Sequence, residues 1–290
     1  MLIELAIGDA YGAAFEYARA KFISRYNHLQ GYARRIRGEL RPGQYTDDTQ
    51  MSLAIVEAML SEERWTAPHL ARRFVEVFKR DPRQGYAKGF YRLLVDVSDG
   101  EELLSRLRPH SDKSGAAMRA SAIGVWPSVG QVVDRCRVQA RITHDTPDGI
   151  NAALAAALMT HYFIYDHGPK HELGRFLEIH VPGQWSLPWM GEVGPKGWMS
   201  VRAAVATVVD HDRMSDILKA AVDWGGDVDT VAAIALAAAS CASEVEQDLP
   251  EVLVEGLEQG PWGRPYLARL DGSLMAMAGR ESRWAHLIDG

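Results

Sequence analysis

The chain has 290 residues, of which 47% are hydrophobic, and this size and composition favour one domain with a large buried core. Its 38 acidic and 32 basic residues give a formal net charge of -6 and are spread evenly, so no basic stripe predicts nucleic-acid binding. Cys136 and Cys241 form no CxxC motif, which argues against a zinc cage or a disulfide framework and favours a reducing compartment.

No segment of the sequence predicts export or membrane insertion. The first residues carry Glu4 and Asp9 and no basic stretch, so they do not resemble a signal peptide. The most apolar stretches, residues 152–159 and 231–242, are too short and too rich in alanine to span a bilayer about 30 Å thick. We therefore expect a cytoplasmic protein with neither a membrane nor a nucleic acid as partner.

Helical periodicity recurs along the chain, whereas alternating β-branched runs bounded by turn residues hardly occur. Many of these segments are rich in alanine, which permits close helix packing, so the sequence predicts an all-α bundle. After an early helix around residue 8, the predicted helices span residues 50–60, 68–78, 150–165, 201–209, 216–222, 231–243 and 250–258. We expect one domain over residues 1–290, with residues 259–290 as a candidate C-terminal extension.

Three segments rich in glycine, proline or polar residues are predicted to be irregular, namely residues 31–45, 98–116 and 181–200. They are candidates for lids over a ligand site. The last of them holds Trp185, Trp189 and Trp198, which either cover the edge of the core or stack on a ligand ring. The sequence leaves both roles open.

The first motif is the N-terminal sequence GDAYGAAFE. Gly8 and Gly12 allow another helix to pack closely, and Asp9 and Glu16 lie seven residues apart. Seven residues are nearly two helical turns, so both carboxylates are predicted to share one helix face and point into one cavity. A solvated acidic stripe would have the same spacing.

The second motif is YTDDTQM, in which Thr46, Asp47, Asp48 and Thr49 precede an amphipathic helix. Hydroxyl and carboxylate oxygens are hard ligands that suit Mg²⁺ or Mn²⁺, and adjacent aspartates can each reach a different ion. A helix N-cap is the alternative, because Ser, Thr and Asp satisfy unpaired N–H groups at helix starts.

The third motif, WGGDVDT, repeats this chemistry. Gly225 and Gly226 allow a tight turn, and Asp227, Asp229 and Thr230 open another apolar helix. An N-cap needs only one such residue, whereas Asp-x-Asp can direct two carboxylates into one cavity. We therefore interpret the two acidic helix starts as halves of one binuclear metal site.

Together these motifs resemble the ADP-ribosylglycohydrolase family, and especially its bacterial branch related to dinitrogen reductase-activating glycohydrolase. The resemblance rests on five segments in order, which are GDAYG at 8–12 with Glu16, RPGQYTDDTQM at 41–51, GAAMR at 115–119, ITH at 142–144 and GGDVDT at 225–230. It implies an orthogonal all-helical fold with two divalent ions, Mg²⁺ or Mn²⁺, at the base of an ADP-ribose cleft. The implied metal ligands are Thr46, Asp47, Asp48, Asp227, Asp229 and Thr230.

The resemblance also implies roles for residues around the metals. Glu16 would lie beside the scissile ribose, as a gate or as the acid–base group. An ionised carboxylate such as Asp47 or Glu16 would take the proton of the attacking water. Asp81 corresponds loosely to an acidic residue near the substrate in the nitrogenase-related branch, which makes it a third candidate for catalysis. The residues implied to contact substrate are Gly115, Ala116, Ala117, Met118 and His144, of which His144 has a structural hydrogen-bonding role as its alternative.

The predicted activity is metal-dependent removal of ADP-ribose from protein side chains, with arginine as the expected linkage. Serine-linked or small-molecule ADP-ribose conjugates are alternative substrates, and a non-catalytic ADP-ribose-binding module is an alternative function. Lys113-Ser114 replaces the Gly-Asn that usually precedes GAAMR, so the contacts to ribose or phosphate are expected to differ. The His-Asp pairs at 144–145 and 211–212 suggest an HD-type phosphohydrolase, but neither has supporting histidine spacing.

Overall fold

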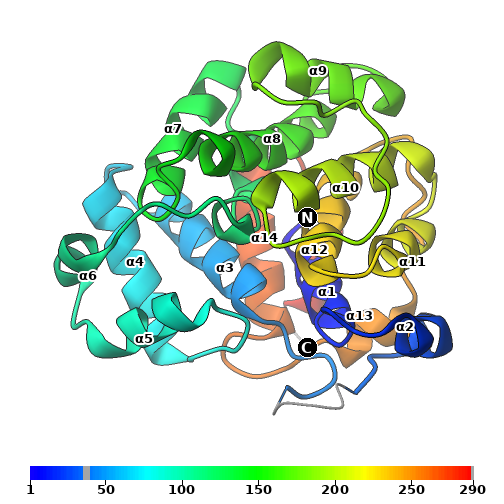
Figure 1. Ribbon diagram of the computed structural model, residues 1–290, viewed down its shortest axis with the longest axis horizontal. Helices are drawn as coiled ribbons and strands as arrows, with labels where there is room; N and C mark the ends of the chain where they lie inside the picture. The colour runs from blue at the N-terminus through cyan, green and yellow to red at the C-terminus, as the bar shows by residue number, and fades with distance from the viewer. Residues whose placement is uncertain (35–39, 289–290) are drawn as a thin grey trace.

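The computed structural model describes residues 1–34 and 40–288, which form α-helices, loops and short 3-10 helices without a β-strand (Figure 1). The predicted all-α class is confirmed. The α-helices are α1 Leu2–Gly12, α2 Ala20–Tyr26, α3 Asp47–Leu60, α4 Ala67–Arg80, α5 Lys88–Asp96, α6 Gly100–Arg106, α7 Val129–Arg141, α8 Pro147–Ile164, α9 Leu173–His180, α10 Gly197–Asp210, α11 Met214–Asp223, α12 Val228–Ala239, α13 Glu251–Gly256 and α14 Arg264–Met277. The 3-10 helices are η1 Ser114–Ala116, η2 Ser121–Val125, η3 Lys170–Glu172 and η4 Ala285–Leu287.

The segments predicted to be irregular differ in outcome. Residues 98–116 contain helix α6, so that prediction is wrong there. The side chain of Asp99 accepts the N–H of Glu102 at 2.9 Å and caps α6, while Leu103 is buried in the core. Residues 35–39 of the segment 31–45 lie outside the described residues. In the segment 181–200, only the end is helical, because α10 begins at Gly197.

Helices α1 and α12 form the centre of the molecule, and every residue of both is buried (Figure 1). The predicted close approach at the N-terminal glycines occurs. A Cβ atom at Gly8 would lie 2.5 Å from the carbonyl oxygen of Ala232, and one at Gly12 would lie 2.4 Å from the Cα of Asp229. Gly12 therefore brings the end of α1 against the start of α12, which carries one of the acidic motifs.

The C-terminal segment packs on the same core. Helix α14 contacts α1 and α3. The buried carboxylate of Asp271 accepts the N–H of Leu2 at 2.7 Å, and the indole N–H of Trp284 donates to Glu4 at 2.8 Å. Residues 264–284 thus share the core of α1 and α3. Over residues 1–34 and 40–288, no helix is both long and apolar enough to cross a membrane.

Candidate metal centre and substrate cleft

The start of α3 is held by a carboxylate from another helix. Thr46 occupies the N-cap position without making a side-chain cap of its own. Instead, the buried Asp9 of α1 accepts the N–H and hydroxyl of Thr46 at 2.9 and 2.7 Å, and those of Thr49 at 3.0 and 2.6 Å. Burial raises the pKa of Asp9, and these hydrogen bonds oppose the rise. Because Asp9 satisfies this helix start, the adjacent aspartates are not needed as caps.

Asp47 and Asp48 are buried at this helix start and line a common cleft. Burial raises the pKa of both carboxyl groups well above the ordinary value, and repulsion from Asp9 and from Asp229, respectively, adds to the rise. One oxygen of Asp48, Oδ1, is buried without a hydrogen-bond partner among the described residues. A buried carboxylate oxygen without a partner is costly, and a bound cation would supply the missing contact.

The aspartates at the start of α12 accept hydrogen bonds from α12 itself and from α10. Gly226 has φ +85°, and a Cβ atom there would lie 1.9 Å from the carbonyl oxygen of Val193, so the turn requires glycine. Asp227 accepts the hydroxyls of Ser200 and Thr230 at 2.8 and 3.2 Å. Asp229 accepts the N–H of Thr230 at 3.0 Å. Burial raises the pKa of both aspartates, and repulsion from Glu16 contributes at Asp229.

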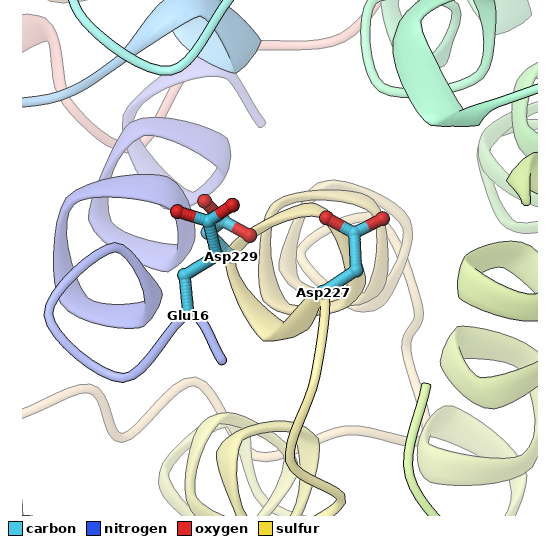
Figure 2. Close-up of side chains that lie close together, drawn as sticks. All are labelled: Glu16, Asp227 and Asp229. Carbon is cyan, nitrogen blue, oxygen red and sulfur yellow. The ribbon is translucent and has the colours of Figure 1, made fainter. Parts of the chain in front are cut away.

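Glu16 lies in the turns that follow α1 and not on the helix itself. Helix α1 ends at Gly12, so the prediction that Asp9 and Glu16 share one helix face is wrong. The buried carboxylate of Asp9 contacts the start of α3, whereas that of Glu16 lies beside the aspartates at the start of α12. One ligand atom each from Glu16, Asp227 and Asp229 lies within 4.8 Å of the others. Figure 2 shows their three carboxylates side by side, with Glu16 next to Asp229.

A cleft of about 570 Å³ opens over these acids. Its base is lined by Asp47, Asp48, Asp227, Asp229, Thr230 and Glu16. The structure therefore brings the two acidic helix starts together, although they lie nearly the full chain apart. Thr46 is buried, with its hydroxyl donating to Asp9. The hydroxyl oxygen of Thr46 retains lone pairs, so Thr46 stays a predicted ligand.

Comparison with known proteins places this arrangement in a family. A family model described as ADP-ribosylglycohydrolase matches residues 1–283. The chain belongs to the ADP-ribosylglycohydrolase family. A solved structure titled "ADP-ribosylglycohydrolase-related protein complex" has the same fold, with a TM-score of 0.72, 21% sequence identity and coverage of 96% of both chains.

Two curated relatives differ in how much of their length aligns. ADP-ribosylhydrolase ARH3 of Xenopus tropicalis is 30% identical over 172 residues, which cover 56% of this chain and 48% of ARH3. The chain thus spans about half the length of this relative. The ADP-ribosyl-dinitrogen reductase glycohydrolase of Rhodospirillum rubrum is 26% identical over 291 residues, which cover 95% of this chain and 94% of that protein.

The GAAMR segment forms one wall of the cleft, but only some of its residues face the opening. Gly115 and Met118 line the cleft. Ala116 and Ala117 have fully buried side chains, so their contact with substrate stays a prediction that can involve only their backbone. The N–H groups of Ala117 and Met118 donate to the carbonyl of Ser114, so neither is available to bind an anion. Small residues serve helix packing here, because η1 contacts both α8 and α10.

His144 lines the cleft beside this wall and is held neutral. Burial and the neighbouring Arg119 lower the pKa of His144 to about 3. Its Nδ1 lies 2.6 Å from the hydroxyl of Thr143, which accepts a hydrogen bond from Arg119. The placement allows a neutral imidazole to contact a substrate through Nε2, and it also gives His144 a structural role. Substrate binding by His144 therefore stays a prediction.

Asp81, a predicted catalytic residue, is occupied elsewhere. Asp81 is the C-cap residue that follows α4. Its carboxylate pairs with Arg83, and Arg83 also pairs with Glu258. Asp81 is not among the described residues that line the cleft, so we do not carry it into the proposed catalytic set. The two His-Asp pairs, at 144–145 and 211–212, do not come together in the cleft. His144 lines the cleft, whereas Asp212 is exposed and pairs with Lys170.

The sequence analysis missed several residues of the cleft wall. Tyr86, Phe90, Leu93 and Leu107 form an apolar part, and the exposed cations Arg106, Arg108 and Lys113 lie near it. None of these residues belongs to a motif, so only the fold reveals them. The tryptophans of residues 181–200 cover the core edge. Trp185 and Trp189 are buried, and Trp189 packs edge-to-face on Trp198 with ring centroids 6.1 Å apart.

The residues at the base of the cleft fit a divalent cation. The donors are carboxylate and hydroxyl oxygens, the ligand type that Mg²⁺ and Mn²⁺ favour. The buried Oδ1 of Asp48 lacks a partner among the residues described, and burial together with mutual repulsion raises the pKa of the surrounding carboxyls. A bound cation would offset both the repulsion and the missing contact.

Proposed function

We propose that this member of the ADP-ribosylglycohydrolase family is a divalent-metal-dependent hydrolase that releases ADP-ribose from ADP-ribosylated protein side chains, with arginine as the linkage. The observation that carries the proposal is the convergence of two acidic helix starts and Glu16 at the base of one cleft. The proposed metal ligands are Thr46, Asp47, Asp48, Asp227, Asp229 and Thr230, which would hold two ions.

The cleft wall supports an ADP-ribosyl ligand. The apolar part around Phe90 and Leu93 suits a purine ring, and Arg108 and Lys113 offer positive charge for a diphosphate. The Rhodospirillum rubrum glycohydrolase aligns over nearly the whole of both chains, which supports the resemblance to the nitrogenase-related branch, and arginine is the linkage that this resemblance implies.

Hydrolysis requires water to attack the anomeric carbon of the ribose while the bond to the side-chain nitrogen breaks. A bound cation would lower the pKa of a water molecule and hold ribose hydroxyls. We infer that Glu16 takes the proton of that water and returns it to the leaving nitrogen, because Asp47 is needed to hold the metal. The products are ADP-ribose and the free arginine side chain.

The test is release of ADP-ribose from an arginine-ADP-ribosylated protein, measured with Mg²⁺, with Mn²⁺ and with EDTA. We expect release with a metal and none with EDTA. Asp47→Ala should lose both Mn²⁺ binding and turnover, whereas Glu16→Gln should keep Mn²⁺ binding and lose turnover. A serine-linked substrate run in parallel tests the linkage, because faster release from serine would contradict the arginine assignment. ADP-ribose binding without any release would indicate a binding module instead.

A further inference from the structure

The backbone of residues 84 and 85 packs against Asp47, and this short stretch is called the Asp47 support. The N–H of Asp47 donates to the carbonyl of Gln84 at 3.1 Å. Gly85 has φ +105°, and a Cβ atom there would lie 1.8 Å from Oδ1 of Asp47. The carboxylate therefore packs directly on the backbone of Gly85, and any movement of this segment would move a predicted metal ligand.

Arg83 connects the Asp47 support to the start of α3. Its side chain is buried and donates to the carboxylates of Asp81 and Glu258 and to the carbonyl of Tyr45. Its guanidinium carbon lies 4.0 Å from the centroid of the Tyr45 ring. Glu258 also accepts the N–H of Tyr45 at 3.1 Å. Arg83 thus joins residues 81–85, the residue just before Thr46, and the segment between α13 and α14.

We propose that Arg83 is a positioning residue for the metal centre, which fixes Asp47 through the backbone of residues 84–85 and through Tyr45. The proposal rests on the proposed function, because it requires that Asp47 holds a divalent cation. It also gives Asp81 a role other than catalysis, as one of two anions that orient the guanidinium. The planar fork of arginine can bind both carboxylates at once, and a lysine ammonium cannot reproduce that geometry.

Metal ligands depend on the groups that hold them. Loss of such an outer partner typically lowers metal affinity about tenfold to a hundredfold. Removing the Arg83 guanidinium would leave Glu258 and Asp81 without their cation and would release the segment that packs on Asp47. We therefore expect weaker metal binding even where the fold survives, because the contacts to Asp47 are made by backbone that the ion pairs hold in place.

Arg80 provides a matched control. It pairs with Glu57, and its guanidinium carbon lies 3.7 Å from the ring centroid of Trp262. Arg80→Met therefore removes an ion pair to α3 and an aromatic contact to Trp262, which lies in the same segment between α13 and α14 as Glu258, the partner of Arg83. The ion pair and the aromatic contact of Arg80 do not involve residues 84–85. A loss of stability alone should affect both variants, whereas a positioning role should affect only Arg83→Met.

The experiment titrates full-length protein with Mn²⁺ and follows the electron paramagnetic resonance signal of the free ion, alongside urea unfolding of each variant. Arg83→Met should weaken Mn²⁺ affinity about tenfold or more, and Arg80→Met less than about twofold. Should Arg83→Met fail to fold, Glu258→Gln removes one of its anionic partners more gently and should weaken affinity in the same direction. Equal affinities in wild type, Arg83→Met and Glu258→Gln would overturn the inference alone. Absence of Mn²⁺ binding by the wild type would overturn the proposed function together with it.

Gly85→Ala tests the contact from the other side. The new Cβ atom would displace the Asp47 carboxylate, so affinity for Mn²⁺ should fall by about tenfold or more. Gly191→Ala is the matched control, because Gly191 also has a positive φ, of +87°, but no atom lies within 4 Å of a Cβ atom there, so its affinity should stay unchanged. If Gly85→Ala bound Mn²⁺ as tightly as the wild type, the Asp47 support would not position Asp47 and the inference would be wrong.

Discussion

The two acidic helix starts meet in one cleft but satisfy their polar groups in different ways. At the start of α12, Asp227 and Asp229 accept hydrogen bonds from Ser200 and Thr230. At the start of α3, the hydrogen bonds converge on Asp9 from a different helix, and Asp48 keeps a buried oxygen without a partner among the residues described. Each aspartate at the start of α12 therefore has a hydrogen-bond partner, whereas one buried oxygen of Asp48 at the start of α3 has none among the described residues.

This difference teaches which half depends more on a cation. A buried carboxylate with a partner loses little when no metal is bound, whereas one without a partner pays the full cost of desolvation. We therefore expect the α3 half to dominate metal-linked changes in stability.

The largest effect should follow from Asp48→Asn. Loss of this ligand should reduce ADP-ribose release about a thousandfold or more, because a metal contributes several kcal/mol to the transition state. The same substitution removes a buried charge that Asp229 repels, so the metal-free protein should gain about 1 kcal/mol or more in stability. Activity assays and urea unfolding in EDTA measure the two effects. A variant that lost both activity and metal-free stability would contradict the charge assignment.

The second prediction concerns Asp9→Asn. The amide cannot accept all four hydrogen bonds from Thr46 and Thr49, because part of it is itself a donor. Leaving buried donors unsatisfied should cost about 2 kcal/mol of unfolding free energy and weaken Mn²⁺ binding. Urea unfolding and Mn²⁺ titration provide the measurements. Lower stability with unchanged affinity would mean that Asp9 supports the fold without supporting the metal centre.

The third prediction is a pH dependence of the metal-free protein. The pKa of Asp48 is raised above its ordinary value of 3.8, so the folded protein binds more protons than the unfolded chain in the range between the two values. The contribution of Asp48 to stability is therefore present at low pH and is lost as the pH rises through the raised pKa. Urea unfolding in EDTA from about pH 5 to pH 8 should show a steeper fall for wild type than for Asp48→Asn. Parallel curves for the two proteins would rule out this role of Asp48.

The two acidic helix starts were easier to group from the sequence than the residues around them. The acids of YTDDTQM and GGDVDT could be grouped because two such helix starts share one chemistry, and the structure brings them to one cleft. The role of Asp9 was not predictable, because it depends on where α1 ends. Had α1 continued past Gly12, Asp9 and Glu16 would have shared a face. Because α1 ends at Gly12, Asp9 is buried and accepts the hydrogen bonds at the start of α3, whereas Glu16 lines the cleft.

The residues of the cleft wall were harder to predict from the sequence, for a different physical reason. Alanines such as Ala116 and Ala117 fit equally well beneath a ligand or against a neighbouring helix, and here they pack in the core. Helix α6 escaped detection because seven residues give too few turns for a clear apolar period. Arg83 belongs to no motif at all, and its contacts join residues as distant as Tyr45 and Glu258. Such long-range ion pairs are specified only by the completed fold.

The smallest effect should follow from Ser200→Ala, which sharpens the comparison from the α12 side. Asp227 would lose one hydrogen bond but keep that of Thr230, so stability should fall by only about 1 kcal/mol. Mn²⁺ affinity should fall less than in Asp9→Asn, because the remaining contacts still fix the carboxylate. Ser240→Ala is the control, since Ser240 is a buried serine of the α12 C-cap whose hydroxyl donates to a backbone carbonyl. If Ser200→Ala weakened Mn²⁺ binding more than Asp9→Asn, the α12 half would be the more dependent one, and the asymmetry between the two helix starts would be reversed.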